Sequence, residues 1–207
     1  SLHDALPIFG KIAGSSRHLL ELVNDVLDMS KIESGKLSIS HEPFNLRSSI
    51  QNINNLIRPQ AQARQLDFDI FLTGVDEEEL CGDSLRLNQI LLNILSNALK
   101  FTPRGGSIRL EIMQLAKKRN TIRLRFIISD TGIGMSEDFL QRLYQPFEQA
   151  SASTAARYGG TGLGMPITSN LVSLMGGVIS VRSREGEGTT FAVELPFGLS
   201  ERAAEKH

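Results

Sequence analysis

The chain has 207 residues, of which 41% are hydrophobic and 22% are charged, and its formal net charge is -1. These values fit one folded domain with a small appendage, and they give no electrostatic basis for binding nucleic acid or an anionic membrane. Cys81 is the only cysteine and no apolar run reaches the ~20 residues of a membrane span, so we expect a cytoplasmic chain without disulfides.

The first predicted element is a helix over residues 11–31. Its apolar residues recur at spacings of three and four, which places them on one broad stripe of a helix: Ile12, Leu19, Leu20, Leu22, Val23, Val26, Leu27 and Met29. The stripe is too wide for a two-stranded seam and suits one helix of a bundle formed with partners. Gly35 then ends the helix.

The next elements alternate between strands and helices. Residues 36–44 alternate as a strand does, and Asn45 is a candidate N-cap for a helix that runs to about Ala63. Residues 66–73 predict a strand followed by an acidic turn. Asp83 is a candidate N-cap for a long helix over residues 84–101, which ends before Thr102 and the following proline.

The last third of the chain is rich in predicted strands. Residues 107–116 and 121–130 flank a short polar turn and predict a hairpin. The hairpin is followed by a short helix and a polar stretch. After these we predict a helix over residues 162–175 and two strands over 177–183 and 189–196. Hairpins beside helices favour an α+β fold, a two-layer sandwich with helices on one face, over a doubly wound parallel sheet.

Three polar side chains share one face of the long predicted helix. Asn93 and Asn97 are four residues apart, and Lys100 is three residues further on. Amide oxygens suit Mg²⁺, and an ammonium group suits phosphate oxygens, so this face could hold a metal-bound polyphosphate. The alternative is the solvated face of an amphipathic helix.

Two glycine-containing segments follow strands. Asp130 ends an apolar strand and could accept a hydrogen bond from an amino group, while Gly132 and Gly134 would let a ligand approach the backbone. A dinucleotide-binding fingerprint is excluded because Glu137 replaces its third glycine. The alternative is a tight turn.

The second glycine segment, residues 159–164, leads into a helix. Free N–H groups at a helix start favour an anion, and glycines remove obstructing side chains. Met165 and Pro166 follow it, so it is not a Walker loop. Residues 151–156 before it are small and polar and could close as a lid, although a flexible linker is the alternative.

The joint order and spacing of these segments resembles sensor histidine kinases. The matching motifs are "NILSNALKFT" (N box), "DTGIGM" and "GGTGLGM" (glycine boxes), "YQPFEQ" (F box) and "GEGTTF" (final glycine box). Upstream, "HLLELVNDVLDMSKIESGK" resembles the second helix of their dimerisation hairpin. The resemblance implies a Bergerat-type (GHKL) ATP-binding fold and covers nearly the whole chain.

Residue roles follow from this resemblance position by position. Asp130 would accept from the adenine amino group beside Gly132 and Gly134, and Asn97 would coordinate Mg²⁺ with support from Asn93. Lys100 would contact phosphate. The remaining expected cofactor-binding residues are those of the lid, its hinge, its anchor and the final box: Arg157, Gly160, Thr161, Gly162, Leu163, Gly164, Phe147, and Thr189 or Thr190.

One position separates branches of the fold. Related ATPases carry a glutamate where this chain has Asn93, and an amide cannot act as a general base at neutral pH. We therefore expect phosphoryl transfer rather than efficient hydrolysis. The alternatives are a non-catalytic nucleotide-sensing or dimerisation module and a GHKL-type ATPase.

The acceptor histidine is not expected within this chain. In the family's acceptor box a proline stands five residues after the histidine, whereas Pro7 is four after His3 and no Arg or Thr lies between them. His18 lies on the predicted second helix and His41 in a strand region. Residues 1–8, "SLHDALPI", resemble the translation of a common sequencing adapter, and we expect them to be an artefact outside the fold.

The expected organisation is therefore residues 9–34 as the second hairpin helix, 35–198 as the ATP-binding catalytic domain and 199–207 as a C-terminal tail. The resemblance implies a protein-histidine kinase that uses ATP and Mg²⁺. Its expected partners are the acceptor-histidine hairpin of the full-length kinase, a response regulator receiver domain and a second copy in a homodimer. The full-length parent could be anchored in the inner or plasma membrane.

Overall fold

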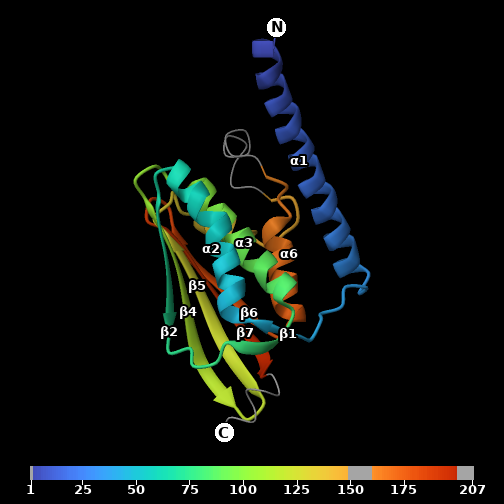
Figure 1. The fold of residues 1–207 in the computed structure, drawn as a ribbon, viewed down its shortest axis with the longest axis vertical. Coiled ribbons are helices and arrows are strands. Elements are labelled where there is room, and N and C mark those ends of the chain that lie inside the picture. Colours follow the sequence, from blue (N-terminus) through green and yellow to red (C-terminus); the bar gives the residue numbers. More distant parts are fainter. Residues whose placement is uncertain (1, 149–159, 200–207) are drawn as a thin grey trace.

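Three helices cover one face of a seven-stranded sheet, and a fourth, long helix stands beside this sandwich (Figure 1). The computed structural model describes residues 2–148 and 160–199. In chain order the elements are α1 Leu2–Glu33, β1 Glu42–Asn45, α2 Leu46–Ala63, β2 Asp67–Thr73, β3 Glu79–Gly82, α3 Ser84–Phe101, β4 Ser107–Lys118, β5 Thr121–Asp130, α4 Glu137–Leu140, α6 Gly164–Leu174, β6 Val178–Arg184 and β7 Gly188–Leu199.

The sheet has the strand order β1-β3-β7-β5-β4-β2, with β6 also paired to β7. All pairs are antiparallel except β2 with β4. The β5–β7 register sets Asp130 opposite Thr189 at the end of the ladder. Two residues that lie far apart in the sequence are thereby fixed next to each other, and the predicted α+β two-layer sandwich is confirmed.

The core lies between the sheet and helices α2, α3 and α6. On β5, Ile122, Leu124, Phe126 and Ile128 alternate inward and are buried, as a sheet with one covered face requires. They face the apolar side of α3, whose buried residues include Leu91. Each such side chain stabilises the fold by about 1.5–3 kcal/mol, which anchors α3 and its opposite, polar face.

Both predicted helix caps form. The Asn45 side chain accepts a 2.9 Å hydrogen bond from the Ser48 N–H, and Asp83 Oδ1 accepts one of 3.0 Å from Arg86. Helix α3 ends at its C-cap, Thr102, as expected from the proline that follows. The α3 helix is therefore fixed in register at both ends.

Two strand predictions need correction. Residues 36–44 were expected to form a strand, but only Glu42–Asn45 does, because its partner β3 is itself four residues long. Strand β3 was not anticipated at all, since four residues are too few for a visible alternation. Residues 36–41 instead run along the domain, where Leu37 and Ile39 pack against the core.

Helix α1 is longer than expected and is tied to the sandwich near its C-terminal end. It begins at Leu2, because a helix needs only local backbone hydrogen bonds to continue beyond its apolar stripe. Asp28 pairs with Arg86 at 3.3 Å and accepts a 2.8 Å hydrogen bond from Gln89, both on α3. The α1 helix also packs against α6.

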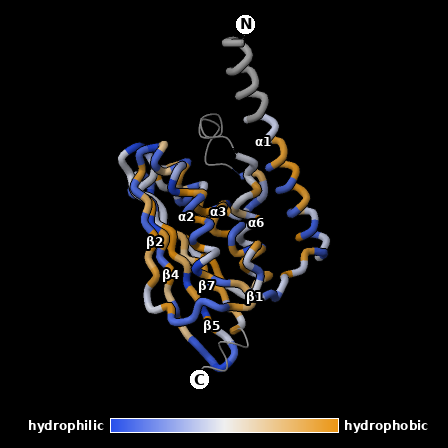
Figure 2. The backbone as a smooth tube through the Cα atoms, viewed as in Figure 1, coloured by the Kyte–Doolittle hydropathy of each residue, from blue (hydrophilic) through white to orange (hydrophobic). Residues whose placement is uncertain are grey.

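Hydrophobic stretches recur along α1 outside this contact (Figure 2). Leu19 is 63% exposed, and its neighbours on the stripe, Leu20, Val23, Val26 and Leu27, are exposed as well.

None of the helices in residues 2–148 and 160–199 combines the length and apolarity that crossing a membrane demands.

Candidate functional site

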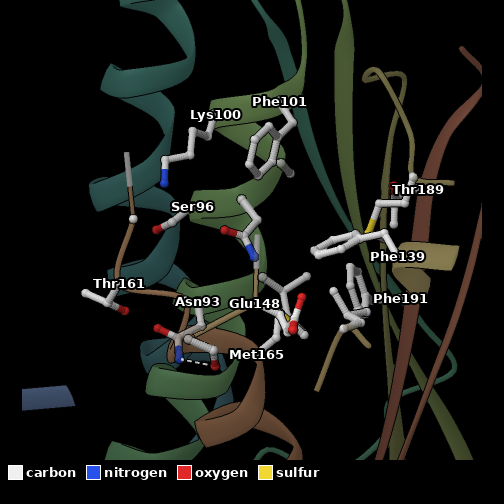
Figure 3. Close-up of a pocket in the computed structure, with 18 of the residues that line it drawn as sticks. Asn93, Ser96, Lys100, Phe101, Phe139, Glu148, Thr161, Met165, Thr189 and Phe191 are labelled. Atoms are coloured by element: carbon white, nitrogen blue, oxygen red, sulfur yellow. Dashed lines mark hydrogen bonds between the residues drawn. The ribbon is translucent and has the colours of Figure 1, made fainter. Parts of the chain in front are cut away.

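A cavity of about 580 Å³ lies between α3, α6, the end of β5 and the flank of α1 (Figure 3). Its wall contains residues from the long helix, from both glycine segments and from the final glycine box that the sequence singled out. Ten predicted site residues line it: Asn93, Asn97, Lys100, Asp130, Gly134, Gly160, Thr161, Gly162, Gly164 and Thr189. Segments separated by up to a hundred residues therefore converge on one space.

The strand end of the cavity consists of Asp130, Gly134 and Thr189. Asp130 Oδ1 accepts a 2.8 Å hydrogen bond from the Gly132 N–H. Burial raises the pKa of the Asp130 carboxyl, and the backbone N–H groups of Gly132 and Thr189 oppose that rise. A half-buried acceptor on a cavity wall favours a ligand that donates a hydrogen bond, such as an amino group.

Glycine is required at position 134 by backbone packing. Gly134 has φ +68°, and a Cβ atom there would lie 1.9 Å from the Arg184 carbonyl oxygen. Gly132 is enclosed as well, since its Cβ would lie 2.7 Å from the Phe101 carbonyl oxygen. The loop after β5 is thus pressed against the β6–β7 turn and the end of α3.

The helix end of the cavity consists of Asn93, Asn97 and Lys100, which come from one face of α3 as their spacing predicted. Asn93 Nδ2 donates to the Gly164 carbonyl oxygen at 3.3 Å, a bond dashed in Figure 3, and to Thr168 Oγ1 at 3.1 Å. Lys100 is half-buried. Burial lowers the pKa of its ammonium group, Arg64 lowers it further, and Glu21 opposes the change.

The glycine loop closes the cavity over Lys100. Gly160 has φ +128°, and a Cβ atom there would come within 3.0 Å of Lys100 Nζ. Gly162 has φ +70°, and its Cβ would lie 2.8 Å from the Phe147 Cα. The loop backbone therefore passes close to both the helix end and the F-box segment.

Four predicted residues lie off the cavity wall. Gly132 donates its backbone N–H to the Asp130 carboxyl group, and Leu163 is buried in the core. Phe147 is 70% exposed, but its N–H donates to the Gly162 carbonyl at 3.0 Å. Thr190 points to the opposite face of the sheet, where its hydroxyl bonds Ser129, so Thr189 is the threonine that reaches the cavity. Arg157 and the expected lid lie outside the described residues.

Sequence reasoning missed the contribution of α1. Glu21 and Asp25 line the cavity, and the Thr161 hydroxyl donates a 2.8 Å hydrogen bond to Asp25 Oδ2. Burial raises the pKa of Asp25, the Thr161 bond opposes this, and the neighbouring Asp28 and Glu21 add to the rise. The available signal was their four-residue spacing, which puts both carboxyl groups on one flank of the helix.

The helix end has the chemistry to hold a hydrated cation together with an anion. Among residues 2–148 and 160–199, no cluster of three or more His, Cys, Asp or Glu side chains is arranged to hold a metal. Oxygen ligands for a hard cation would come instead from the amides of Asn93 and Asn97 and from the ligand's own oxygens. Lys100 and the glycine loop add a positive charge and backbone N–H groups.

A family model described as histidine kinase-, DNA gyrase B-, and HSP90-like ATPase matches residues 82–199. The autoinducer 2 sensor kinase/phosphatase LuxQ of Vibrio parahaemolyticus is 43% identical over 190 residues, which are 91% of this chain and 22% of LuxQ. The sensor histidine kinase GacS of Pseudomonas protegens is also 43% identical over 190 residues, 92% of this chain and 21% of GacS. The chain thus spans about a fifth of the length of these relatives.

A solved structure, full-length ShkA in complex with AMPPNP, matches with a TM-score of 0.75 and 32% sequence identity. The match covers 90% of this chain and 37% of ShkA. At 90% coverage the match must include part of α1, whereas the family model begins at residue 82 and includes none of it.

Proposed function

Since this chain belongs to the family of histidine kinase-, DNA gyrase B-, and HSP90-like ATPases, we propose that it is the ATP-binding catalytic part of a sensor histidine kinase. The observation that supports this most is the convergence of Asp130, Asn97 and Lys100 on one cavity of about 580 Å³. A hydrogen-bond acceptor at one end, with amide oxygens and a cation at the other, matches a ligand that has an amino-bearing base and a polyphosphate.

At the strand end, Asp130 accepts a hydrogen bond from the adenine amino group. Gly132 and Thr189 hold this carboxyl through their N–H groups, so it is oriented before the ligand arrives. Gly134 allows the loop to lie tight against the Arg184 carbonyl on this side of the cavity. The apolar residues Phe139, Met135 and Phe191 line the same space, and they bury the faces of the base.

At the helix end, Asn97 and Asn93 would present amide oxygens to Mg²⁺, and Lys100 would contact phosphate oxygens. The donor set fits a hard cation, which prefers oxygen ligands and usually retains waters and substrate phosphates. Bound Mg²⁺ supplies charge neutralisation to the polyphosphate. The backbone N–H groups of Gly160, Gly162 and Gly164 would be available to the phosphates. The absence of a side chain at Gly160 leaves space beside Lys100 Nζ.

The reaction is phosphoryl transfer to another protein segment. The bond between the γ-phosphorus of ATP and its bridging oxygen breaks, a bond to an imidazole nitrogen of the acceptor hairpin forms, and ADP leaves. Asn93 cannot take a proton from water, so hydrolysis in the same cavity is slow. From histidine the phosphoryl group passes to an aspartate of a response regulator.

The catalytic domain comprises residues 35–198, and residues 9–34, which contain most of α1, form the second helix of the dimerisation hairpin. The exposed stripe of Leu19, Val23 and Val26 is the surface that a partner helix would cover. A full-length kinase is therefore a homodimer, and this chain self-associates weakly through the stripe. Sedimentation at rising concentration tests this, and a strictly monomeric profile would contradict it.

The test of nucleotide binding is thermal unfolding with and without Mg-ADP or Mg-ATP. A ligand at about 100 times its dissociation constant adds roughly 2.7 kcal/mol, which raises the melting temperature of a chain this size by about 5–10 °C. The shift should require Mg²⁺ and should be absent in Asp130→Asn. No shift in a folded sample would refute the proposal.

Adding an acceptor hairpin then distinguishes a kinase from a protein that only binds nucleotide. Transfer of labelled phosphate to the hairpin supports the kinase. Binding without transfer would indicate a nucleotide-sensing module, and rapid phosphate release without acceptor would indicate an ATPase.

A further inference from the structure

Thr168 is an unusual residue for the core of this domain. Its side chain in α6 is 0% exposed, and it is one of four buried polar residues among those described. Burying a hydroxyl group without partners costs free energy that a similarly sized valine would avoid. Thr168 uses both of its hydrogen-bonding capacities, because it donates to the Gly164 carbonyl at 2.8 Å and accepts from Asn93 Nδ2 at 3.1 Å.

This pairing fixes which end of the Asn93 amide faces α6. A hydroxyl has one proton, and the proton of Thr168 is committed to the carbonyl four residues earlier in its own helix. Toward Asn93, Thr168 can therefore only accept. The Gly164 carbonyl, 3.3 Å from Asn93 Nδ2, is also an acceptor. With two acceptors on the α6 side, the amide nitrogen must face α6, and a flipped amide would place oxygen against oxygen.

The consequence appears on the other side of the amide. Asn93 Oδ1 points away from the bond to Gly164 and toward the cavity that Asn93 lines (Figure 3). The helix end of the cavity thus receives an oxygen from Asn93, the ligand type that Mg²⁺ accepts, and not an N–H₂ group, which would repel it.

We propose that Thr168 is a positioning residue, whose hydroxyl holds the Asn93 carboxamide with Oδ1 toward a nucleotide-bound Mg²⁺. The proposal rests on the function proposed above. It also links α3 to the glycine loop, because the shared acceptor Gly164 is the first residue of α6. Thr168 touches neither metal nor nucleotide and acts through Asn93 alone.

The test compares Thr168→Val, which removes the hydroxyl and keeps the volume, with Thr168→Ser, which keeps the hydroxyl. Calorimetry measures ADP binding in EDTA, and a Mg²⁺ titration at saturating ADP measures metal affinity. Outer-shell partners of metal ligands are worth about 10–100-fold in metal affinity. We expect Thr168→Val to lose at least about tenfold in Mg²⁺ affinity, with metal-free ADP binding unchanged and Thr168→Ser close to wild type.

Two further comparisons isolate the mechanism. In an Asn93→Ala background, Thr168→Val should cause no additional loss of Mg²⁺ affinity, because the residue through which it acts is gone. If Thr168→Val does not fold, Thr168→Ala and Thr168→Ser differ by one oxygen atom and serve as the pair.

The outcomes are distinct. Equal Mg²⁺ affinity in wild type and Thr168→Val would overturn the positioning role alone. Parallel losses with and without Mg²⁺, or a further loss in the Asn93→Ala background, would assign Thr168 a structural role and overturn it too. Wild-type protein that binds no nucleotide would overturn the proposed function and this inference together.

Discussion

The two ends of the cavity are built by different means. At the strand end, backbone atoms set the shape: Asp130 and Thr189 are fixed by sheet register, and Gly134 is pressed against a carbonyl group. At the helix end, side chains from α1, α3 and the glycine loop meet without a shared ladder. The strand end should therefore be rigid and intolerant of added atoms, whereas the helix end should respond to charge and to ligand.

The largest expected effect is at Gly134. Gly134→Ala places a Cβ atom 1.9 Å from the Arg184 carbonyl oxygen at φ +68°, so the loop must move. We expect a loss of about 3 kcal/mol or more in unfolding free energy, together with the loss of nucleotide binding. Urea denaturation measures the first and thermal shift with Mg-ADP the second.

Gly186→Ala is the matched control for that substitution. Gly186 also has a positive φ, of +79°, but a Cβ atom there meets nothing within 4 Å. It should cost only the backbone strain, about 1–2 kcal/mol, and leave binding intact. Equal losses in the two variants would mean that close packing does not define the strand end.

The next largest effect is expected at Asn97, at the helix end. Asn97→Ala removes an amide oxygen from a half-exposed position, so the fold should be unaffected. Mg²⁺-dependent nucleotide affinity should fall by at least about tenfold, since even outer-shell partners are worth that much. Calorimetry with and without Mg²⁺ measures this. Ser96→Ala, next along α3 on the same cavity wall, should bind as wild type, and an equal loss there would contradict a ligand role for Asn97.

Spacing in the sequence predicted the features that lie within one element, but not how separate elements meet at the cavity. The caps Asn45 and Asp83 and the face shared by Asn93, Asn97 and Lys100 follow from spacing within one element. Their convergence with Asp130 required the resemblance to a family, because spacing within a helix carries no information about a strand that follows it by thirty residues.

The features that the sequence did not predict depend on contacts between residues that lie far apart in the chain. Strand β3 is too short to have a pattern of its own, and it exists because β1 and β7 pair with it. The approach of Asp25 to Thr161 depends on how α1 rests on α6, which hydrophobic periodicity does not specify. The orientation of the Asn93 amide likewise depends on Gly164 and Thr168, which lie more than seventy residues away.

A smaller effect is expected from the α1 carboxyl groups. They test whether the helix end, unlike the strand end, responds to charge. Glu21 and Asp25 line the cavity near Lys100 and Thr161, so they should repel the phosphates of ATP. Unit charges ~8 Å apart interact by about 0.5 kcal/mol in water. Glu21→Gln with Asp25→Asn removes two such charges, about 1 kcal/mol in total, and should therefore bind Mg-ATP roughly fivefold more tightly at low salt. The gain should shrink at high salt.

Adenosine and Glu33→Gln are the controls for this double variant. Adenosine has no phosphates, so its affinity should not change. Glu33 is exposed at the end of α1 and outside the cavity wall, and its replacement should leave Mg-ATP binding as it is. Weaker Mg-ATP binding by the double variant would show that the carboxyl groups assist the ligand, contrary to the repulsion argued here.

The smallest effect is the pH dependence of stability set by Asp130, at the strand end. Burial raises the pKa of its carboxyl above the ordinary 3.8, so the folded protein holds this proton to higher pH than the unfolded chain. Stability of the ligand-free protein therefore falls as pH rises from the ordinary value through the raised one. Asp130→Asn removes this loss, so its melting temperature relative to wild type should rise between about pH 4 and pH 7. Asp69→Asn, at an exposed position of β2, should track wild type. If the melting temperature of Asp130→Asn also followed that of wild type over this pH range, burial of the Asp130 charge would not reduce the stability of the folded protein.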